Sequence, residues 1–195
     1  MKQKKEDQRA RLTQQLLKNA LIECMQKERI SKISVRELCE RAGINRSTFY
    51  LHYYDIYDLY NSIKIEVIED LNRYLKQEDI VNESSSLLQV YIAILNYIKK
   101  NEELFQILLN DDNGVDFIDD IMKLAQSISM KSNFIFEERT EKYIEIFGIG
   151  GYTSVLKKWM NDGMIESPEF LAEFIVHIFY HGYSGLKNSS KFERF

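Results

Sequence analysis

The chain has little of what several classes of protein need. It holds 195 residues but only one proline, eight glycines and two cysteines. Two cysteines exclude a disulfide-rich scaffold and indicate a reducing compartment, and so little proline and glycine excludes a collagen-like or linker-like chain. The longest run without a charged residue, Ser84–Ile98, has 15 residues, and Phe174–Leu186 has 13, whereas a membrane-spanning helix needs about 20. Because the N-terminal MKQKKEDQRAR also lacks an apolar stretch, we expect a cytoplasmic protein with no secretory signal and no membrane partner.

What is present is typical of a globular protein with an uneven charge. Hydrophobic residues make up 45% and charged residues 29% of the chain, enough for a real core. The formal net charge of −4 divides into +6 for residues 1–54 and −10 for residues 55–195. A basic segment on an acidic body is expected where one part must approach a polyanion. A solvated basic tail would give the same balance, since five of the twelve basic residues lie in the first eleven positions.

Apolar spacing is helical nearly throughout, which predicts an all-α fold. A first helix carries an apolar stripe of Leu12, Leu16, Ala20, Leu21, Cys24 and Met25, and Cys24 and Cys39 are expected in the packed core. After two short helices, we expect helices at 56–77, 86–100, 102–110, 115–130, 138–162 and 168–186. The serine-rich stretch Glu78–Ser86 is interpreted as a hinge. The predicted domains are therefore 1–54, a connecting helix at 55–77, and a regulatory and dimerisation domain at 78–195.

The window from Ser34 to His52 predicts a helix-turn-helix unit. Ser34 caps its first helix, with Glu37 placed to complete a capping box, and Gly43 ends that helix in a left-handed conformation. Asn45 begins a second short helix, whose Phe49 and the following Tyr53 are expected to turn inward. In such a unit the second helix enters the major groove of DNA.

The second helix of this unit has a polar outer face. Arginine makes bidentate contacts with guanine, hydroxyls bind bases or phosphates, and a tyrosine hydroxyl suits a phosphate oxygen. An ordinary helical hairpin with a polar surface has the same pattern, so the pattern alone leaves both interpretations open. The side chains expected to be exposed are Asn45, Arg46, Ser47, Thr48, Tyr50 and His52.

Leu12 to about Leu71 resembles the N-terminal DNA-binding domain of TetR/AcrR-type transcriptional regulators. The resemblance rests on Ile33-Ser34-Val35, Ala42-Gly43-Ile44 and the run T-F-Y-L-H-Y at Thr48–Tyr53. The later F-G-I-G-G-Y-T-S-V-L-K-K-W-M-N-D-G, followed by S-P-E-F-L-A, is similar to the C-terminal domain of dihydroxyacetone-kinase-type regulators in that family.

The resemblance implies an all-helical homodimer that binds a palindromic site on double-stranded DNA. The family positions for base reading fall on Arg46, Ser47 and Thr48, with Arg36 as a further candidate. Those for phosphate anchoring fall on Ser34, Tyr50 and His52.

One position departs from the family pattern. Members commonly have a lysine at the start of the fourth helix, where it meets a phosphate, and this chain has Ile56. Either Tyr54 or Tyr57 replaces that contact, or DNA affinity is lower and its salt dependence shallower.

The last two helices are the expected dimer interface, since Phe147–Leu156 and Phe170–Leu186 are rich in apolar and small residues. An unknown small-molecule effector is expected in the second domain, although aromatic residues at helical spacing are equally typical of plain core. The first candidates to line its site are Tyr91, Phe105, Phe147 and Tyr152.

The spacing of Glu173, His177 and His181 admits a zinc site, but hydrogen-bonded structural roles are commoner, so we expect neither metal nor cofactor. No phosphate-binding glycine loop or G-x-S-x-G turn is present, which argues against an enzyme. We expect a ligand-responsive repressor that acts as a homodimer. The alternative is a helical dimeric adaptor or coactivator that binds protein partners.

Overall fold

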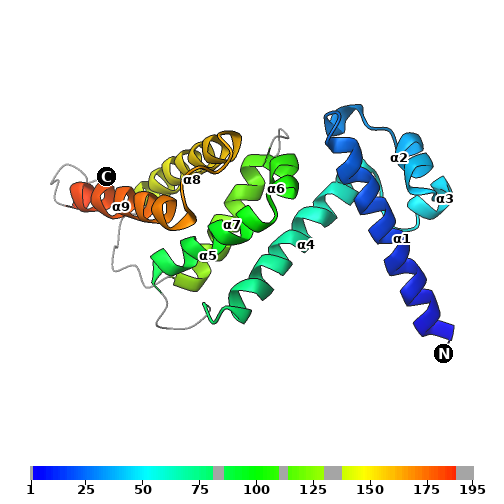
Figure 1. Ribbon diagram of the computed structural model, residues 1–195, viewed down its shortest axis with the longest axis horizontal. Helices are drawn as coiled ribbons and strands as arrows, with labels where there is room; N and C mark the ends of the chain where they lie inside the picture. Colours follow the sequence, from blue (N-terminus) through cyan, green and yellow to red (C-terminus); the bar gives the residue numbers. More distant parts are fainter. Residues whose placement is uncertain (1, 81–85, 110–113, 130–137, 188–195) are drawn as a thin grey trace. The chain divides into compact units, whose positions relative to one another are not determined.

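The computed structural model describes residues 2–80, 86–109, 114–129 and 138–187, and all regular structure in these ranges is helical (Figure 1). The predicted all-α fold is confirmed. The chain forms two compact units, Met1–Val67 and Ile68–Phe195. No described helix has both the length and the apolar character needed to cross a membrane.

The first unit contains α1 (Lys2–Met25), a 3₁₀ turn (Ile30–Lys32), α2 (Val35–Ala42), α3 (Arg46–Phe49) and the first half of α4 (Ile56–Gln77). α1 packs against α2, and α2 packs against α3. Their apolar faces meet in a small core whose fully buried side chains are Leu17, Leu21, Leu38, Phe49, Leu59 and Tyr60.

The apolar stripe predicted on α1 is buried only in part. Leu12 and Leu16 are 61% and 40% exposed, whereas Ala20 and Cys24 are buried. Each step of four residues advances about 40° around a helix, so a stripe that begins at Leu12 has turned away by about 120° at Cys24. The stripe therefore does not coincide with one buried face of α1, and its Leu12 and Leu16 lie outside the core.

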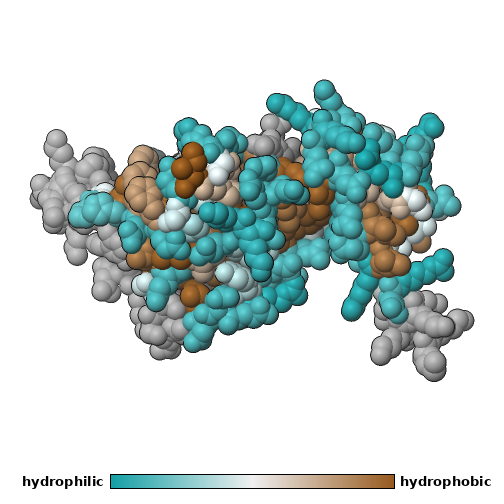
Figure 2. Space-filling model, in the orientation of Figure 1, coloured by the Kyte–Doolittle hydropathy of each residue, from teal (hydrophilic) through white to brown (hydrophobic). Residues whose placement is uncertain are grey.

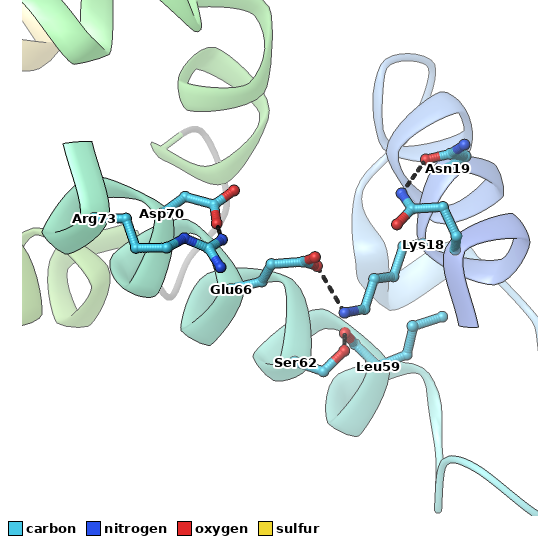
Figure 3. A network of polar contacts seen from close by, with 8 residues as sticks. Lys18, Asn19, Leu59, Ser62, Glu66, Asp70 and Arg73 are labelled. Carbon is cyan, nitrogen blue, oxygen red and sulfur yellow. Dashed lines mark hydrogen bonds and ion pairs between the residues drawn. The ribbon is translucent and has the colours of Figure 1, made fainter. Parts of the chain in front are cut away.

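An ion pair joins α1 to the first half of α4 within the first unit. Lys18 Nζ lies 2.7 Å from Glu66 Oε2, and the two side chains point toward each other across the space between their helices (Figure 3). The Lys18 side chain is only 16% exposed, which shields the pair from solvent. This contact links α4 to α1, which in turn packs against α2 of the predicted helix-turn-helix.

The second unit contains the end of α4, α5 (Leu87–Lys100), α6 (Glu102–Leu109), α7 (Gly114–Ser129), α8 (Glu138–Asn161) and α9 (Pro168–Lys187). α5 packs against α7 and α9, while α7 also packs against α6 and α8. The largest fully buried side chains here are Leu71, Leu75, Ile94, Leu95, Phe105 and Phe117.

Capping residues fix several helix ends close to the limits predicted for those helices. Ser86 and Gln89 form a capping box at the start of α5, and the Phe170 backbone N–H donates to Ser167 Oγ at the start of α9. Gly163, with φ +81°, follows the end of α8. Because these signals are local, the predicted ranges agree with the observed helices to within a few residues.

The division into units differs from the expected domain limits. The expected segments 1–54, 55–77 and 78–195 treat all of α4 as a connection, whereas the compact units divide inside α4, after Val67. Most of the predicted hinge, residues 81–85, lies outside the described residues.

Apolar side chains remain exposed on one face of α8 and one face of α9. Brown patches interrupt the hydrophilic surface over these helices on the side drawn in Figure 2. We call this surface the α8–α9 face. Its exposed apolar members are Tyr143, Ile146 and Phe147 on α8 and Phe170, Phe174 and Ile178 on α9.

Candidate nucleic-acid interface

The first helix of the predicted helix-turn-helix is held at both ends. Ser34 has an extended backbone, and its Oγ accepts a hydrogen bond from the Glu37 backbone N–H at 3.2 Å. Leu38 and Cys39 are buried in the core, which leaves Arg36, Glu40 and Arg41 exposed on the other side of α2. The serine cap predicted from the sequence is confirmed.

The turn between α2 and α3 depends on Gly43. Its φ of +66° lies in the left-handed region, where a Cβ strains the backbone. The Ile44 backbone N–H donates to the Cys39 carbonyl oxygen at 3.0 Å and closes the end of α2. The chain thereby reverses sharply and places α3 beside α2.

Two aromatic side chains hold α3 against the core of the first unit. Phe49 is fully buried and Tyr53 is 7% exposed, and their ring centroids are 5.9 Å apart. Tyr50 meets the edge of Phe49 at 5.3 Å in a T-shaped arrangement. Because backbone hydrogen bonds continue to Tyr53, residues 45–53 form one rigid piece, which we call the recognition segment.

The outer face of the recognition segment carries the predicted polar residues. Asn45, Arg46 and Ser47 are exposed, and Tyr50 is 52% exposed. Thr48 and His52 are half-buried, so each presents only part of its side chain. Asn45 makes no side-chain capping hydrogen bond, although it stands at the cap position of α3.

The two predicted contacts outside this segment lie on the same unit. Ser34 and Arg36 are exposed at the start of α2. Arg36 Nε donates to Glu40 Oε1 at 2.9 Å, and this hydrogen bond raises the pKa of the guanidinium. Arg36 would have to leave Glu40 to reach a base, but exposed ion pairs of this kind stabilise little.

Sequence reasoning did not name one exposed residue of the recognition segment. Leu51 is 81% exposed between Tyr50 and His52. Its place in the run T-F-Y-L-H-Y gives no signal of exposure, because it lies between the buried Phe49 and Tyr53. An exposed apolar side chain here suits the methyl group of thymine.

The start of α4 presents tyrosines and carboxylates. Ile56, where the family commonly has lysine, is buried at 6% exposure, whereas Tyr54 is 86% and Tyr57 44% exposed. The Tyr54 backbone N–H donates to Asp58 Oδ2 at 2.9 Å, and the Asp58 N–H donates to Asp55 Oδ1 at 2.8 Å. A phosphate contact at this point would therefore come from a tyrosine.

The four residues first considered for effector binding do not form one group. The rings of Tyr91 and Tyr152 lie 5.9 Å apart, and Tyr91 Oη donates to Met122 Sδ at 3.6 Å. Phe105 instead stacks with Phe117, with ring centroids 5.7 Å apart. Phe147 is 80% exposed, because it lies on the outward side of α8.

Both cysteines are core residues of the first unit, as predicted. Cys24 is 1% and Cys39 3% exposed. Burial raises the pKa of each thiol, although the positive charges of Arg41 and Arg46 act in the opposite direction on Cys24 and Cys39 respectively. Neither thiol has the lowered pKa of a reactive cysteine.

Comparison with known proteins places the second unit in a family. Residues 85–181 match the TetR-type family model described as "Transcriptional regulator C-terminal region". The chain is 23% identical over 165 residues to an uncharacterized HTH-type transcriptional regulator, YxbF, of Bacillus subtilis (strain 168). That match covers 80% of this chain but only 42% of the longer relative.

Solved structures share the fold over most of the chain. A TetR transcriptional regulator from Streptococcus agalactiae 2603V is 20% identical, covers 89% of this chain and 97% of its own, and gives a TM-score of 0.68. The dihydroxyacetone kinase operon activator DhaS is 18% identical, covers 88% and 96%, and gives 0.53.

The fatty acid degradation regulator FadR from Bacillus halodurans is 13% identical, covers 87% and 95%, and gives a TM-score of 0.54. The family match, the curated relative and these folds agree with the resemblance found in the sequence, and the relatives are regulators rather than enzymes. Residues 85–181 thus match the C-terminal region of TetR-type transcriptional regulators, and the chain as a whole is similar in sequence and fold to regulators of this type.

Proposed function

We propose that this protein is a ligand-responsive transcriptional repressor that binds a palindromic operator as a homodimer. The observation that carries the proposal is the outer face of the recognition segment, where Arg46, Ser47 and Tyr50 are exposed together above the buried Phe49. Such a face has the donors and acceptors that major-groove recognition uses. A surface that binds nothing does not require an arginine, a serine and a tyrosine to be exposed together.

The chemistry of each predicted DNA-contact side chain suits it to either a base or a phosphate. Arg46, with Ser47 and Thr48, would read base edges, and Arg36 would add a base contact after leaving Glu40. Ser34, Tyr50 and His52 would hold phosphates, because a hydroxyl or imidazole N–H donates to phosphate oxygens without reading sequence. Asn45 has no capping bond to give up, so its amide adds a donor and an acceptor at the segment's first position.

The homodimer is proposed to form through the α8–α9 face. Its six exposed apolar side chains would leave water when a second copy covers them. Gly150 and Gly151 are exposed on the same side of α8, and a Cβ built on either would meet nothing of this chain within 4 Å. Glycines with open space around them favour the close approach of a helix from another copy. Two recognition segments about 34 Å apart would then read successive turns of DNA.

The effector is proposed to bind in the second unit, near Tyr91 and Tyr152. Thr153, next to Tyr152 on α8, is 5% exposed, and its Oγ1 has no hydrogen-bond partner among the described residues. A buried hydroxyl without a partner is costly, and a polar group of a small molecule would satisfy it. Allosteric control requires this molecule to favour one arrangement of the two recognition segments by a few kcal/mol.

One observation favours the adaptor alternative. At the start of α4 the buried Ile56 replaces the family's lysine, and the carboxylates of Asp55 and Asp58 stand beside exposed Tyr54 and Tyr57. A surface that has lost a cationic phosphate contact binds DNA less tightly. Loss of DNA binding altogether would convert the regulator into an adaptor for protein partners.

Selection of bound duplexes from a random DNA pool separates the two functions. The repressor proposal predicts enrichment of an inverted repeat whose half-site centres lie about 10 base pairs, or a multiple of one helical turn, apart. The adaptor alternative predicts no enriched sequence. Enrichment of a single half-site without a repeat would support DNA reading and contradict the homodimer.

A further inference from the structure

Two histidines lie together on the exposed side of α9. The ring centroids of His177 and His181 are 4.1 Å apart, and the ring planes are inclined by 45°. Residues four apart on a helix share a face, and both side chains are exposed. Within a single chain they are therefore not the buried core histidines that the apolar sequence of this helix would favour.

This arrangement suits chelation of one divalent transition-metal ion. Zinc binds imidazole nitrogen at about 2.0–2.1 Å, so two nitrogens on one tetrahedral ion lie about 3.3 Å apart. Rings whose centroids are 4.1 Å apart reach this separation by small rotations of their side chains. Imidazole is a ligand for zinc, copper and nickel, whereas magnesium and calcium prefer oxygen.

One chain supplies only part of a coordination shell. A structural zinc ion takes four protein ligands, but within the described residues no three His, Cys, Asp or Glu side chains are grouped to hold a metal. Glu173, one turn before His177, is exposed on the same side of α9, yet it does not complete such a group. The remaining ligands have to come from outside the chain.

The position of the pair points to a second copy as their source. At 3.6 residues per turn, His177 and His181 lie about 20° to either side of Phe170 around the axis of α9. Phe170 and Phe174 are 57% and 44% exposed, so the imidazoles lie within the apolar stripe of the α8–α9 face. A two-fold interface is built from the same patch of both copies, and with its axis passing between the two histidine pairs they would supply four imidazole ligands.

We propose that His177 and His181 of two copies bind one zinc-class ion at the α8–α9 face; this inference rests on the homodimer proposed above. The apolar side chains around the ion would exclude water from it. Glu173 of each copy would balance the charge and accept a hydrogen bond from a ligating imidazole, the role that second carboxylates commonly have at zinc sites. The ion would link dimerisation, and with it operator binding, to metal supply.

The test is a metal titration of the full chain after removal of metal with a chelator. Zn²⁺ is measured by competition with a chromophoric chelator, and Co²⁺ by the visible absorption that intensifies in tetrahedral coordination. The expected result is one ion per two chains and a tetrahedral cobalt spectrum. We expect His177→Gln and His181→Gln each to weaken binding at least tenfold, and Glu173→Gln to weaken it about 10–100-fold.

The matched control is His52→Gln, which removes the chain's third histidine in the other compact unit; its metal affinity should equal that of the unaltered chain. One ion per chain, an octahedral cobalt spectrum, or unchanged affinity in His177→Gln would overturn the shared site. Sedimentation of the metal-free chain separates the two proposals. If the chain is dimeric but binds no metal, only the metal site is overturned. If the chain is monomeric both with and without metal, the homodimer is overturned.

Discussion

At the scale of single residues, the recognition segment depends on which side chains face inward. Phe49 and Tyr53 are buried, and their burial leaves Arg46, Ser47 and Tyr50 on the opposite side of the same short helix. Each buried aromatic side chain contributes about 1.5–3 kcal/mol through removal of apolar area from water. A four-residue helix could not keep its shape on hydrogen bonds alone, so the anchors fix the geometry that DNA would meet.

Gly43→Ala should destabilise the first unit by about 1–2 kcal/mol, because the φ of +66° is unfavourable for any residue with a Cβ. A Cβ at this position meets no neighbouring atom within 4 Å, so the cost comes from the backbone alone. Urea unfolding measures this loss of stability. Gly43→Asn is the matched variant and should lose less, since asparagine tolerates this conformation better; equal losses would contradict the backbone explanation.

The buried cysteines should be slow to react. Burial raises the pKa of Cys24 and Cys39 above the ordinary value of 9.0, so both stay protonated at pH 8, and the thiolate is the reactive form. Their stabilising effect on the fold is complete below pH 9 and falls as the pH rises through the folded-state pKa values. Iodoacetamide labelling at pH 8 should be much slower in the native chain than in urea. Equal rates would show that the thiols are accessible.

At the scale of elements, α4 is the helix on which regulation would act, because it belongs to both compact units. The ion pair between Lys18 and Glu66 holds its first half to α1 (Figure 3). In the second unit, Arg73 pairs with Asp70 along α4 itself, and the ring of Tyr74 lies 5.4 Å from Tyr97 of α5. Each half of α4 is thus attached to its own unit.

A double-mutant cycle on Lys18→Met and Glu66→Gln should give a coupling of about 1 kcal/mol, the upper end for partly exposed pairs. The reason is the 16% exposure of Lys18, which limits screening by solvent. Urea unfolding of the two single variants and the double variant provides the measurement. Arg36→Met with Glu40→Gln is the control cycle on a fully exposed pair, and a coupling no larger than in this control would contradict a specific link between α1 and α4.

The sequence was sufficient to predict most helix ends but not every buried face. Ser34, Gly43, Ser86, Gly163 and Ser167 mark ends by local hydrogen bonding and backbone conformation, so they are visible in sequence. The exposure of Leu12 depends on which side of α1 the other helices cover, and that is a tertiary property. For the same reason Phe147 was expected near Tyr152, although residues five apart on α8 point in different directions.

The recognition segment was predictable for a different reason. Its turn, its inward aromatics and its outward polar residues lie within 20 residues of sequence, so local pattern and tertiary placement agree. Thr48 and His52 are half-buried, which the pattern did not distinguish from full exposure. The bare sequence had no signal for the contact of His177 with His181 beyond their spacing, because exposure decides between a structural and a ligating role.

At the scale of the whole molecule, the proposed function requires two copies. One recognition segment would read only a few base pairs, and the exposed apolar side chains of α8 and α9 have no cover within the described residues of one chain. A single surface would therefore serve dimerisation, and through His177 and His181 it would also serve metal binding. Dimerisation and metal binding would therefore be coupled through the α8–α9 face.

Phe174→Glu should convert the dimer to a monomer at micromolar concentration, because it places a charge on each side of a two-fold interface. Sedimentation equilibrium measures the change. The matched control is Ile165→Glu, which alters an apolar residue that is 78% exposed in the connection between α8 and α9. If both variants remain dimers, the interface lies elsewhere; if both dissociate, the effect of charge is not local.

The central claim, that the outer face of the recognition segment reads DNA, is tested most directly by the affinity of Arg46→Ala for its selected operator and for random duplex. The account predicts a loss of about 1–3 kcal/mol on the operator, with relaxed preference at one base position and little loss on random DNA. Arg139→Ala, which removes an exposed charge from α8, should bind both duplexes as the unaltered chain does. An equal loss by Arg46→Ala on both duplexes, or no loss at all, would contradict the claim.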